Sequence, residues 1–282
     1  MNIDTLTLQQ FRKLPLVVEG ESKEVRYVGN GEVIIRLKPT VYSYTYNRGG
    51  EIPGSDVARL RAIQLLLPIL RNAGIEHTYL EVNDRWVHSQ LVLQPAVAGD
   101  PEPFTPHDLT PAQLAELPRA TPLEIVVKAR HSGTPKHRYY RLSDYPTREG
   151  GHIQPDQLYP CPIVRFDWRN PLVDEQGNRL ADEVVPEPMA EWFCDTTATR
   201  YTAERAFKAL SEQLASKGLD LWDICFFIAE DGQTMFGEVS PDCLRVRAHD
   251  GSALDKDVWR AGGSSEHVLA KWQQFVELLE KG

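Results

Sequence analysis

The chain has 282 residues and a formal net charge of −9, with 25% charged and 41% hydrophobic residues. This length allows a substantial core, as one large domain or two lobes, and the composition is typical of a globular protein. The negative charge disfavours nucleic acid as a partner, and no apolar stretch approaches the ~20 residues that a membrane span requires.

The cysteines and the N-terminus indicate the compartment. Four cysteines, none in a Cys-x-x-Cys pair, favour reduced thiols and argue against a zinc site. The first residues lack the basic region and apolar block of a secretory signal. We therefore expect a cytoplasmic protein.

The first third of the chain reads as strands around one helix. A short helix is expected up to Arg12, capped by Asp4 or Thr5. Ser55 is a good N-cap for a helix that Asn72 to Gly74 closes, and Pro68 should kink it or end a first segment. Alternating apolar residues predict strands at 16–18, 24–28 and 32–37, and a hairpin of 77–82 with 85–93.

Prolines become frequent after residue 94, and we place a hinge there. The predicted organisation is a β-rich lobe at 1–94, a proline-rich linker at 95–121 and an α+β lobe at 122–282. Within the second lobe we expect a strand from 122, a helix at 202–217, a hairpin of 221–228 with 234–239, and a helix at 265–279.

Charged residues follow the hairpin of 221–239 directly. Ser240, Asp242 and Arg245 come first, and the charged run 255–260 follows. A rigid sheet can hold such groups in a cleft at its end. A solvated hairpin end is the alternative reading.

Two further segments suit phosphate. A strand from 122 ends in Lys128, Arg130 and Thr134 around a glycine, which supplies cations, a hydroxyl and backbone N–H donors. At 20–23 a glycine permits close backbone approach and Lys23 supplies a mobile cation. An exposed basic turn is the alternative in both places.

These segments together resemble SAICAR synthetases. GEVSPD at 237–242 with Arg245, then LDKDVWR at 254–260, is similar to that family's G-D-E-(F/V/I)-S-P-D-x-x-R and (L/M)-D-K-D-x-(F/W)-R. PLEIVVKARHSGT at 122–134 and GESKEV at 20–25 also resemble family motifs. The resemblance implies an α+β fold of two lobes, an antiparallel-sheet N-terminal lobe and an ATP-grasp-like C-terminal lobe with nucleotide in the cleft.

The resemblance also implies a reaction and its residues. Family enzymes use ATP and Mg²⁺ to join aspartate to the carboxylate of an aminoimidazole ribonucleotide, so small-molecule ribonucleotide and amino acid substrates are expected. It places Glu124, Asp242 and Arg245 in catalysis. It places nucleotide binding at Gly20, Ser22, Lys23 and Arg169, and substrate phosphate at Lys128, Arg130, Ser132, Thr134, Ser240 and Arg245.

Three departures from the family pattern concern charge. Phe227 and Gly237 stand at the positions of two usual magnesium ligands, and Glu21 replaces one phosphate-facing lysine. Glu124, Asp223 and Glu238 are the candidate replacement ligands, with Asp223 expected to share a strand face with Phe227.

Three functions therefore stay open. They are an ADP-forming ligase, a catalytically silent nucleotide-binding protein, and an enzyme that kept the ribonucleotide site but replaced the ATP chemistry. The sequence does not decide the carboxylate, the amine, a housekeeping or specialised role, or whether the chain forms a homo-oligomer.

Overall fold

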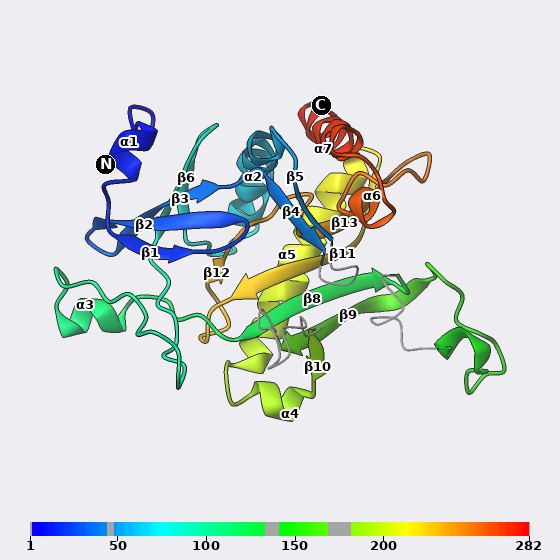
Figure 1. Cartoon of the computed structure of the whole chain (residues 1–282). Helices are drawn as coiled ribbons and strands as arrows, with labels where there is room; N and C mark the ends of the chain where they lie inside the picture. Colours follow the sequence, from blue (N-terminus) through cyan, green and yellow to red (C-terminus); the bar gives the residue numbers. More distant parts are fainter. Residues whose placement is uncertain (1, 44–47, 133–140, 169–181, 282) are drawn as a thin grey trace.

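The computed structural model describes residues 2–43, 48–132, 141–168 and 182–281. Its described strands form two larger antiparallel sheets and one small hairpin (Figure 1). The fold class predicted from the sequence, α+β with antiparallel sheets, is confirmed. In the part of the chain that is described, no helix is both long and apolar enough to cross a membrane.

The N-terminal sheet has five strands in the order β1-β2-β3-β7-β6. Turns at positive φ join β2 to β3, where Gly29, Asn30 and Gly31 all lie in the left-handed region. One face of this sheet packs on helix α2 through alternating apolar residues. The strands are β1 (Leu16–Glu19), β2 (Lys23–Gly29), β3 (Glu32–Leu37), β6 (Tyr79–Val82) and β7 (Val87–Gln90).

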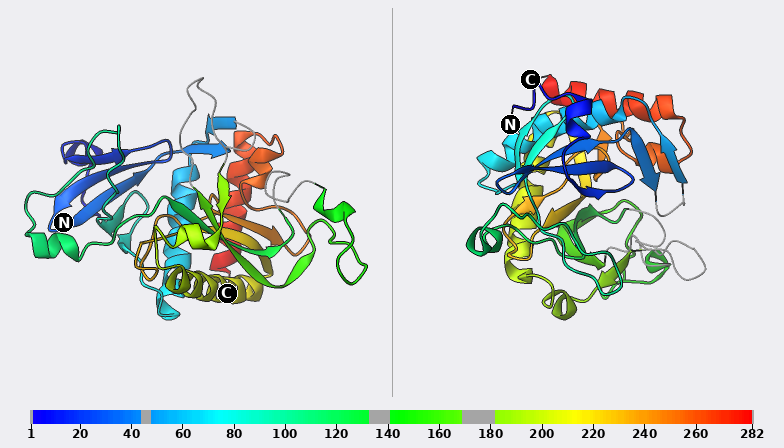
Figure 2. Two further views of the ribbon diagram at one scale, coloured as in Figure 1. Left: turned by 90° about the horizontal axis from the view of Figure 1, so that it is seen from below. Right: turned by 60° about the vertical axis from the view of Figure 1, so that its left-hand side comes forward.

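The C-terminal sheet is organised around the strand β11. One side of β11 pairs with β8, and the other side pairs first with β13 and then with β12. Helix α5 packs against this sheet and covers its apolar face (Figure 2). The strands are β8 (Leu123–Arg130), β9 (Leu158–Trp168), β10 (Glu183–Val185), β11 (Leu219–Ile228), β12 (Met235–Phe236) and β13 (Leu244–Ala248).

Helix α2 (Ser55–Asn72) contributes to both large cores. Its Leu60, Ile63 and Leu67 pack with the N-terminal sheet. Its Ala62, Leu66 and Leu70 pack with the C-terminal sheet and α5. The left view of Figure 2 shows α2 (cyan) running between the N-terminal strands and the C-terminal sheet, and α2 packs beside α7 (Ser265–Glu280).

The remaining elements are short apart from α5 and α7. A hairpin of β4 (Thr40–Ser43) and β5 (Arg48–Glu51) lies against α6, where the Arg48 guanidinium stacks 3.6 Å from the Trp259 ring. The helices are α1 (Leu8–Phe11), α3 (Pro111–Ala115), the 3₁₀ turn η3 (Leu142–Asp144), α4 (Glu187–Ala190), α5 (Thr196–Ser216), α6 (Asp257–Arg260) and α7 (Ser265–Glu280).

Several element boundaries differ from the predictions. Thr7 caps α1 with Gln10 in a capping box, in place of Asp4 or Thr5. Gly54 is the N-cap of α2, so Ser55 is not, and α2 continues through Pro68. Asp195 caps α5, so that helix begins at Thr196 and not at Thr202.

The predicted strand at 234–239 was also too long. Strand β12 ends at Phe236 because Gly237 adopts φ +85°, which turns the chain out of the sheet.

Candidate active site

Two cavities meet between the N-terminal sheet and the C-terminal sheet. The first, here called the hairpin cavity, has a volume of about 440 Å³ and lies under the β1–β2 turn. The second, the charged cavity, has a volume of about 290 Å³ and lies over β8 and β11. Six residues line both cavities and form what we call the junction: Ser22, Lys23, Tyr42, Phe236, Asp242 and Lys256.

The hairpin cavity combines aliphatic walls with a polar rim. Its walls include Val17, Val25, Val33, Ile35 and Leu91. The rim is the β1–β2 turn, with Gly20, Glu21, Ser22 and Lys23. Lys38 fastens this turn, because its ammonium donates to the Gly20 carbonyl at 2.9 Å and pairs with Glu19. An apolar slot whose polar rim includes a lysine can hold a planar ring that carries an anionic group.

Asp223 is the acid at the floor of the charged cavity. Its Oδ2 accepts from the Arg245 guanidinium and from Ser132 Oγ at 3.2 Å, and lies 3.5 Å from Lys128 Nζ. Burial raises the pKa of Asp223, but the charges of Arg245 and Lys128 outweigh it and hold the pKa below its ordinary value. Asp223 is therefore the counter-ion of the two cations assigned to substrate phosphate.

A β-bulge turns Asp223 toward this cavity. The pairing of β11 with β13 shifts between Leu221 and Asp223, so Trp222 is an extra residue in the strand. After the bulge, Asp223, Cys225 and Phe227 all line the charged cavity. The shared face predicted for Asp223 and Phe227 is confirmed.

Arg245 connects the cavity to the charged run before α6. Its Nε donates to Asp257 at 2.8 Å. Asp257 also forms ion pairs with Arg247 at 2.6 Å and Arg260 at 2.7 Å. Burial raises the pKa of Asp257, but these guanidinium groups outweigh it and hold the pKa far below its ordinary value. The network fixes Arg245 in one orientation.

Opposite charges are balanced around the charged cavity. Six basic side chains line it: Lys23, Lys128, Arg165, Arg245, Lys256 and Arg260. Six acidic side chains line it as well: Glu124, Asp167, Asp182, Asp223, Glu238 and Asp242. An anionic ligand therefore has to compete with carboxylates of the protein for these cations.

The loop after β12 carries a second cluster. Arg59 of α2 is fully buried and holds Glu238 in a bidentate ion pair, with Arg59 Nε 2.6 Å from Glu238 Oε1. Burial opposes the charge of Arg59, but Glu238 outweighs it and raises the pKa. Ser240 Oγ donates to Glu238 as well, and Lys256 Nζ lies 2.9 Å from Asp242 Oδ1.

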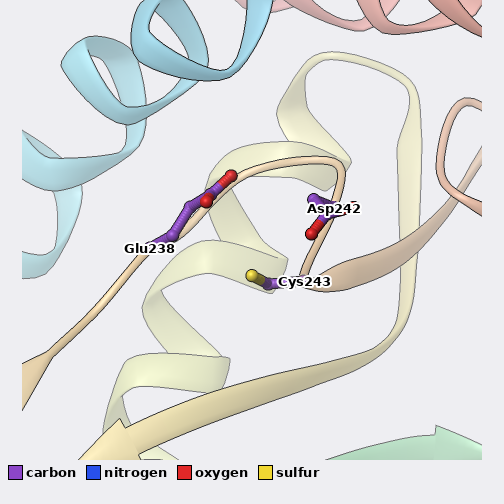
Figure 3. Close-up of side chains that lie close together, drawn as sticks. All are labelled: Glu238, Asp242 and Cys243. Atoms are coloured by element: carbon purple, nitrogen blue, oxygen red, sulfur yellow. The ribbon is translucent and has the colours of Figure 1, made fainter. Parts of the chain in front are cut away.

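Glu238, Asp242 and Cys243 lie close together on this loop (Figure 3). Both carboxylates are already paired with cations, Glu238 with Arg59 and Asp242 with Lys256. Burial and the neighbouring acids raise the pKa of Cys243 well above its ordinary value, which disfavours the thiolate.

Mg²⁺ fits this set of residues poorly. Both oxygens of Glu238 are held by Arg59, and Asp223 Oδ2 and Asp242 Oδ1 each hold a cationic side chain, so a metal ion at these acids would compete with cations of the protein. Glu124 lines the charged cavity and accepts from the Cys225 thiol, with the sulfur 3.3 Å from Oε2. Mg²⁺ requires several oxygen ligands in near-octahedral geometry, and three of the acids here are held by cations of the protein.

The structure brings together most of the residues singled out in the sequence. Gly20, Ser22 and Lys23 line the hairpin cavity, and Lys128, Glu124, Asp223, Glu238, Asp242 and Arg245 line the charged cavity. Ser132 and Ser240 are buried behind the charged cavity, where they donate to Asp223 and Glu238.

Arg130 lies outside both cavities. Two other predicted site residues fall outside the described part of the chain. The Arg130 guanidinium pairs with Asp220 at 2.8 Å and is not among the residues that line either cavity. Thr134 and Arg169 lie outside the described residues.

Sequence reasoning missed Arg59, Lys256 and the pair Arg165–Asp167. Arg59 lies on the buried face of α2 beside Ala62 and Ile63, and a charged residue on an apolar stripe was the available signal. Arg165 and Asp167 are two apart on β9, which predicts one face, and Arg165 Nε donates to Asp167 at 2.6 Å. Lys256 was inside a recognised motif but had no assigned role.

The fold of this chain is similar to that of solved SAICAR synthetases. The SAICAR synthetase of Ehrlichia chaffeensis superposes with a TM-score of 0.71, covering 94% of this chain and 98% of that one, at 18% identity. A SAICAR synthetase in complex with ADP superposes with a TM-score of 0.68 over 95% of this chain and 98% of the other, at 19% identity. The fold is thus the SAICAR synthetase fold.

Sequence comparison points to the same family. No protein-family model matches the chain. A Cordyceps militaris protein named "Bifunctional cordycepin biosynthesis cluster protein 3" is 29% identical over 95% of this chain, which spans only 33% of that protein. The phosphoribosylaminoimidazole-succinocarboxamide synthase of Thermococcus sibiricus is 23% identical, over 86% of this chain and 89% of that protein. The resemblance inferred from the motifs is confirmed.

Proposed function

We propose that the chain is a carbon–nitrogen ligase of SAICAR synthetase type. It would use ATP, form ADP, and join the amine of an amino acid to the carboxylate of an aminoimidazole-type ribonucleotide. The observation that carries this proposal is the junction, where a slot for a planar ring opens into a cavity lined by Lys128 and Arg245. Such an arrangement lets a terminal phosphoryl group meet a carboxylate.

The reaction proceeds in two steps. A carboxylate oxygen of the ribonucleotide attacks the γ-phosphorus of ATP, the bond to the bridging oxygen breaks, and ADP leaves. The amine nitrogen then attacks the acyl carbon, phosphate leaves, and the nitrogen loses a proton. Activation is needed because a carboxylate has no leaving group for an amine to displace.

The residues of the chain divide this work. The aliphatic walls of the hairpin cavity hold the base, and Lys23 binds the nucleotide phosphates. Lys128 and Arg245 bind the phosphate of the ribonucleotide. Glu124, on β8, faces the charged cavity and is assigned the proton of the attacking amine. Asp242 holds Lys256 at the junction.

The pathway and the location are part of the proposal. The Cordyceps relative is named for a cordycepin biosynthesis cluster, which supports a specialised role over a housekeeping one. Four free cysteines support a cytoplasmic location. The cleft would lie between lobes 1–94 and 122–282, joined by 95–121.

The alternative is a nucleotide-binding protein without ATP-dependent chemistry. It is favoured by Phe227 and Gly237 at the positions of two family metal ligands. ADP release from ATP, with a carboxyaminoimidazole ribonucleotide and a panel of amino acids including aspartate, separates the two. The ligase sustains ADP release over many turnovers only when both acceptor and amine are present. Nucleotide binding without such release, in a folded protein, supports the alternative.

A further inference from the structure

At the positions of the two family metal ligands the chain carries an apolar contact. We call this contact the interlock, and it consists of Phe227, Phe236 and Gly237. Phe227 and Phe236 stand opposite each other on β11 and β12, with ring centroids 5.7 Å apart. Gly237 has φ +85°, and a Cβ built on it would lie 2.8 Å from the Phe227 ring. A side chain at 237 is therefore excluded while Phe227 is present, so the two departures depend on each other.

The interlock lies where the nucleotide and the acceptor would meet. Phe236 lines both cavities, Phe227 lines the charged cavity, and Gly237 lines the hairpin cavity. Of the acids that line the charged cavity, Asp223, Glu238 and Asp242 are each held by a lysine or arginine. Charge on a nucleotide phosphate at this point must be met by something other than a metal held by these carboxylates.

Lysines from both parts of the molecule reach the junction. Among the described residues, Lys23 of β2 and Lys256 before α6 are the two basic residues that line both cavities. Lys256 Nζ is anchored 2.9 Å from Asp242 Oδ1 and 3.4 Å from the Tyr42 carbonyl, and an ammonium has three protons to donate. Phe236 lines both cavities with these lysines, and an apolar neighbour strengthens an ammonium–phosphate contact by lowering the local dielectric.

We propose that this chain binds nucleotide phosphates with Lys23 and Lys256 in place of a divalent cation. The inference rests on the proposed nucleotide site in the hairpin cavity. Glu21 and Asp242 also line that cavity, so direct contacts to the two ammonium groups, and not a general positive field, provide the binding. Nucleotide affinity is accordingly independent of magnesium.

Calorimetric titration of the full chain with ADP, in magnesium or in EDTA, tests this directly. The two dissociation constants should agree within about threefold, since no metal contact is lost. In EDTA, Lys256→Met should weaken ADP binding by about 10- to 100-fold, the loss expected for one charge-assisted hydrogen bond. Lys256→Arg should restore most of it. Adenosine, which has no phosphate, should bind wild type and Lys256→Met alike.

Lys208→Met is the matched control, because Lys208 is exposed on α5 and pairs only weakly with Glu212. ADP binding that tightens tenfold or more with magnesium overturns the inference and leaves the nucleotide site intact. Absence of ADP binding in both buffers overturns the nucleotide site and the inference together. The double variant Phe227→Glu with Gly237→Asp restores two carboxylates, and its ADP affinity should become magnesium-dependent.

Discussion

Arg59 and Glu238 form a bidentate ion pair inside the protein, between helix α2 and the loop that carries Ser240 and Asp242. The two residues are 179 positions apart in the chain, so the pair joins distant segments. Glu238 lines the charged cavity, and Arg59 holds its carboxylate there from α2. Arg59 is therefore a positioning residue of the site, although it lies in a helix whose sequence predicts only core packing.

Arg59→Met should destabilise the protein by about 3–5 kcal/mol, because it leaves Glu238 buried without a counter-ion. Urea unfolding measures this loss. The double variant with Glu238→Met should recover much of it. Arg61→Met is the control, since Arg61 and Glu280 are more than 40% exposed and should contribute less than about 1 kcal/mol. Equal losses for Arg59→Met and Arg61→Met would contradict the assignment.

Gly237→Ala should cost about 1–2 kcal/mol for positive φ and a further ~1–3 kcal/mol for the overlap with Phe227. Combining it with Phe227→Ala should remove the second part only, which a double-mutant cycle in urea resolves. Gly251→Ala provides the reference, because Gly251 has φ +80° and open space around its Cβ position. Additive effects of the two changes would argue against the interlock.

Asp223→Asn should destabilise the protein at pH 7 by about 3–5 kcal/mol, since Arg245 and Lys128 lose a buried counter-ion. The folded-state pKa of Asp223 lies below its unfolded value of 3.8, so its stabilisation is present above pH 3.8 and is lost as pH falls further. The stability difference between wild type and Asp223→Asn should therefore shrink as the pH falls below 3.8. A difference that stays constant as the pH falls would be inconsistent with an ionised Asp223.

Lys128→Met and Arg130→Met should differ in their effect on ribonucleotide binding, although both residues end the same strand. Lys128 lines the charged cavity, whereas Arg130 pairs with Asp220 outside it. We expect Lys128→Met to weaken binding of a carboxyaminoimidazole ribonucleotide by about 10- to 100-fold, and Arg130→Met by less than about threefold. Calorimetry with the phosphorylated ligand and its dephosphorylated nucleoside shows whether the loss follows the phosphate.

The sequence predicted the elements with strong local signals. Strand β3 and helix α2 agree with their predicted ranges because apolar periodicity and turn glycines define them. The N-terminal extension of α5 was missed because its first turn, Thr196 to Thr199, is poor in helix-forming residues. Strand β12 was overextended because nothing in the local pattern distinguishes Gly237 at positive φ from glycine within a strand.

The sequence predicted the site residues that lie in recognised motifs. It did not predict which side chains these residues pair with. Asp223 was singled out as a metal candidate, yet its two cationic contacts come from β8 and β13, which are distant in sequence. Arg130 was grouped with Lys128 on local composition, but Asp220 from β11 holds it elsewhere. Ion pairing across strands depends on register, which single-sequence patterns do not specify.

The participation of α2 in both cores has a consequence for how the chain acquires its structure. A fragment ending after residue 94 would leave Ala62, Leu66 and Leu70 facing water, while the remainder of the chain would carry an uncovered patch over α5. Apolar surface of that kind promotes aggregation. The two halves should thus unfold in one cooperative transition. Neither half should stay folded after proteolytic cleavage within 95–121 and separation from the other half.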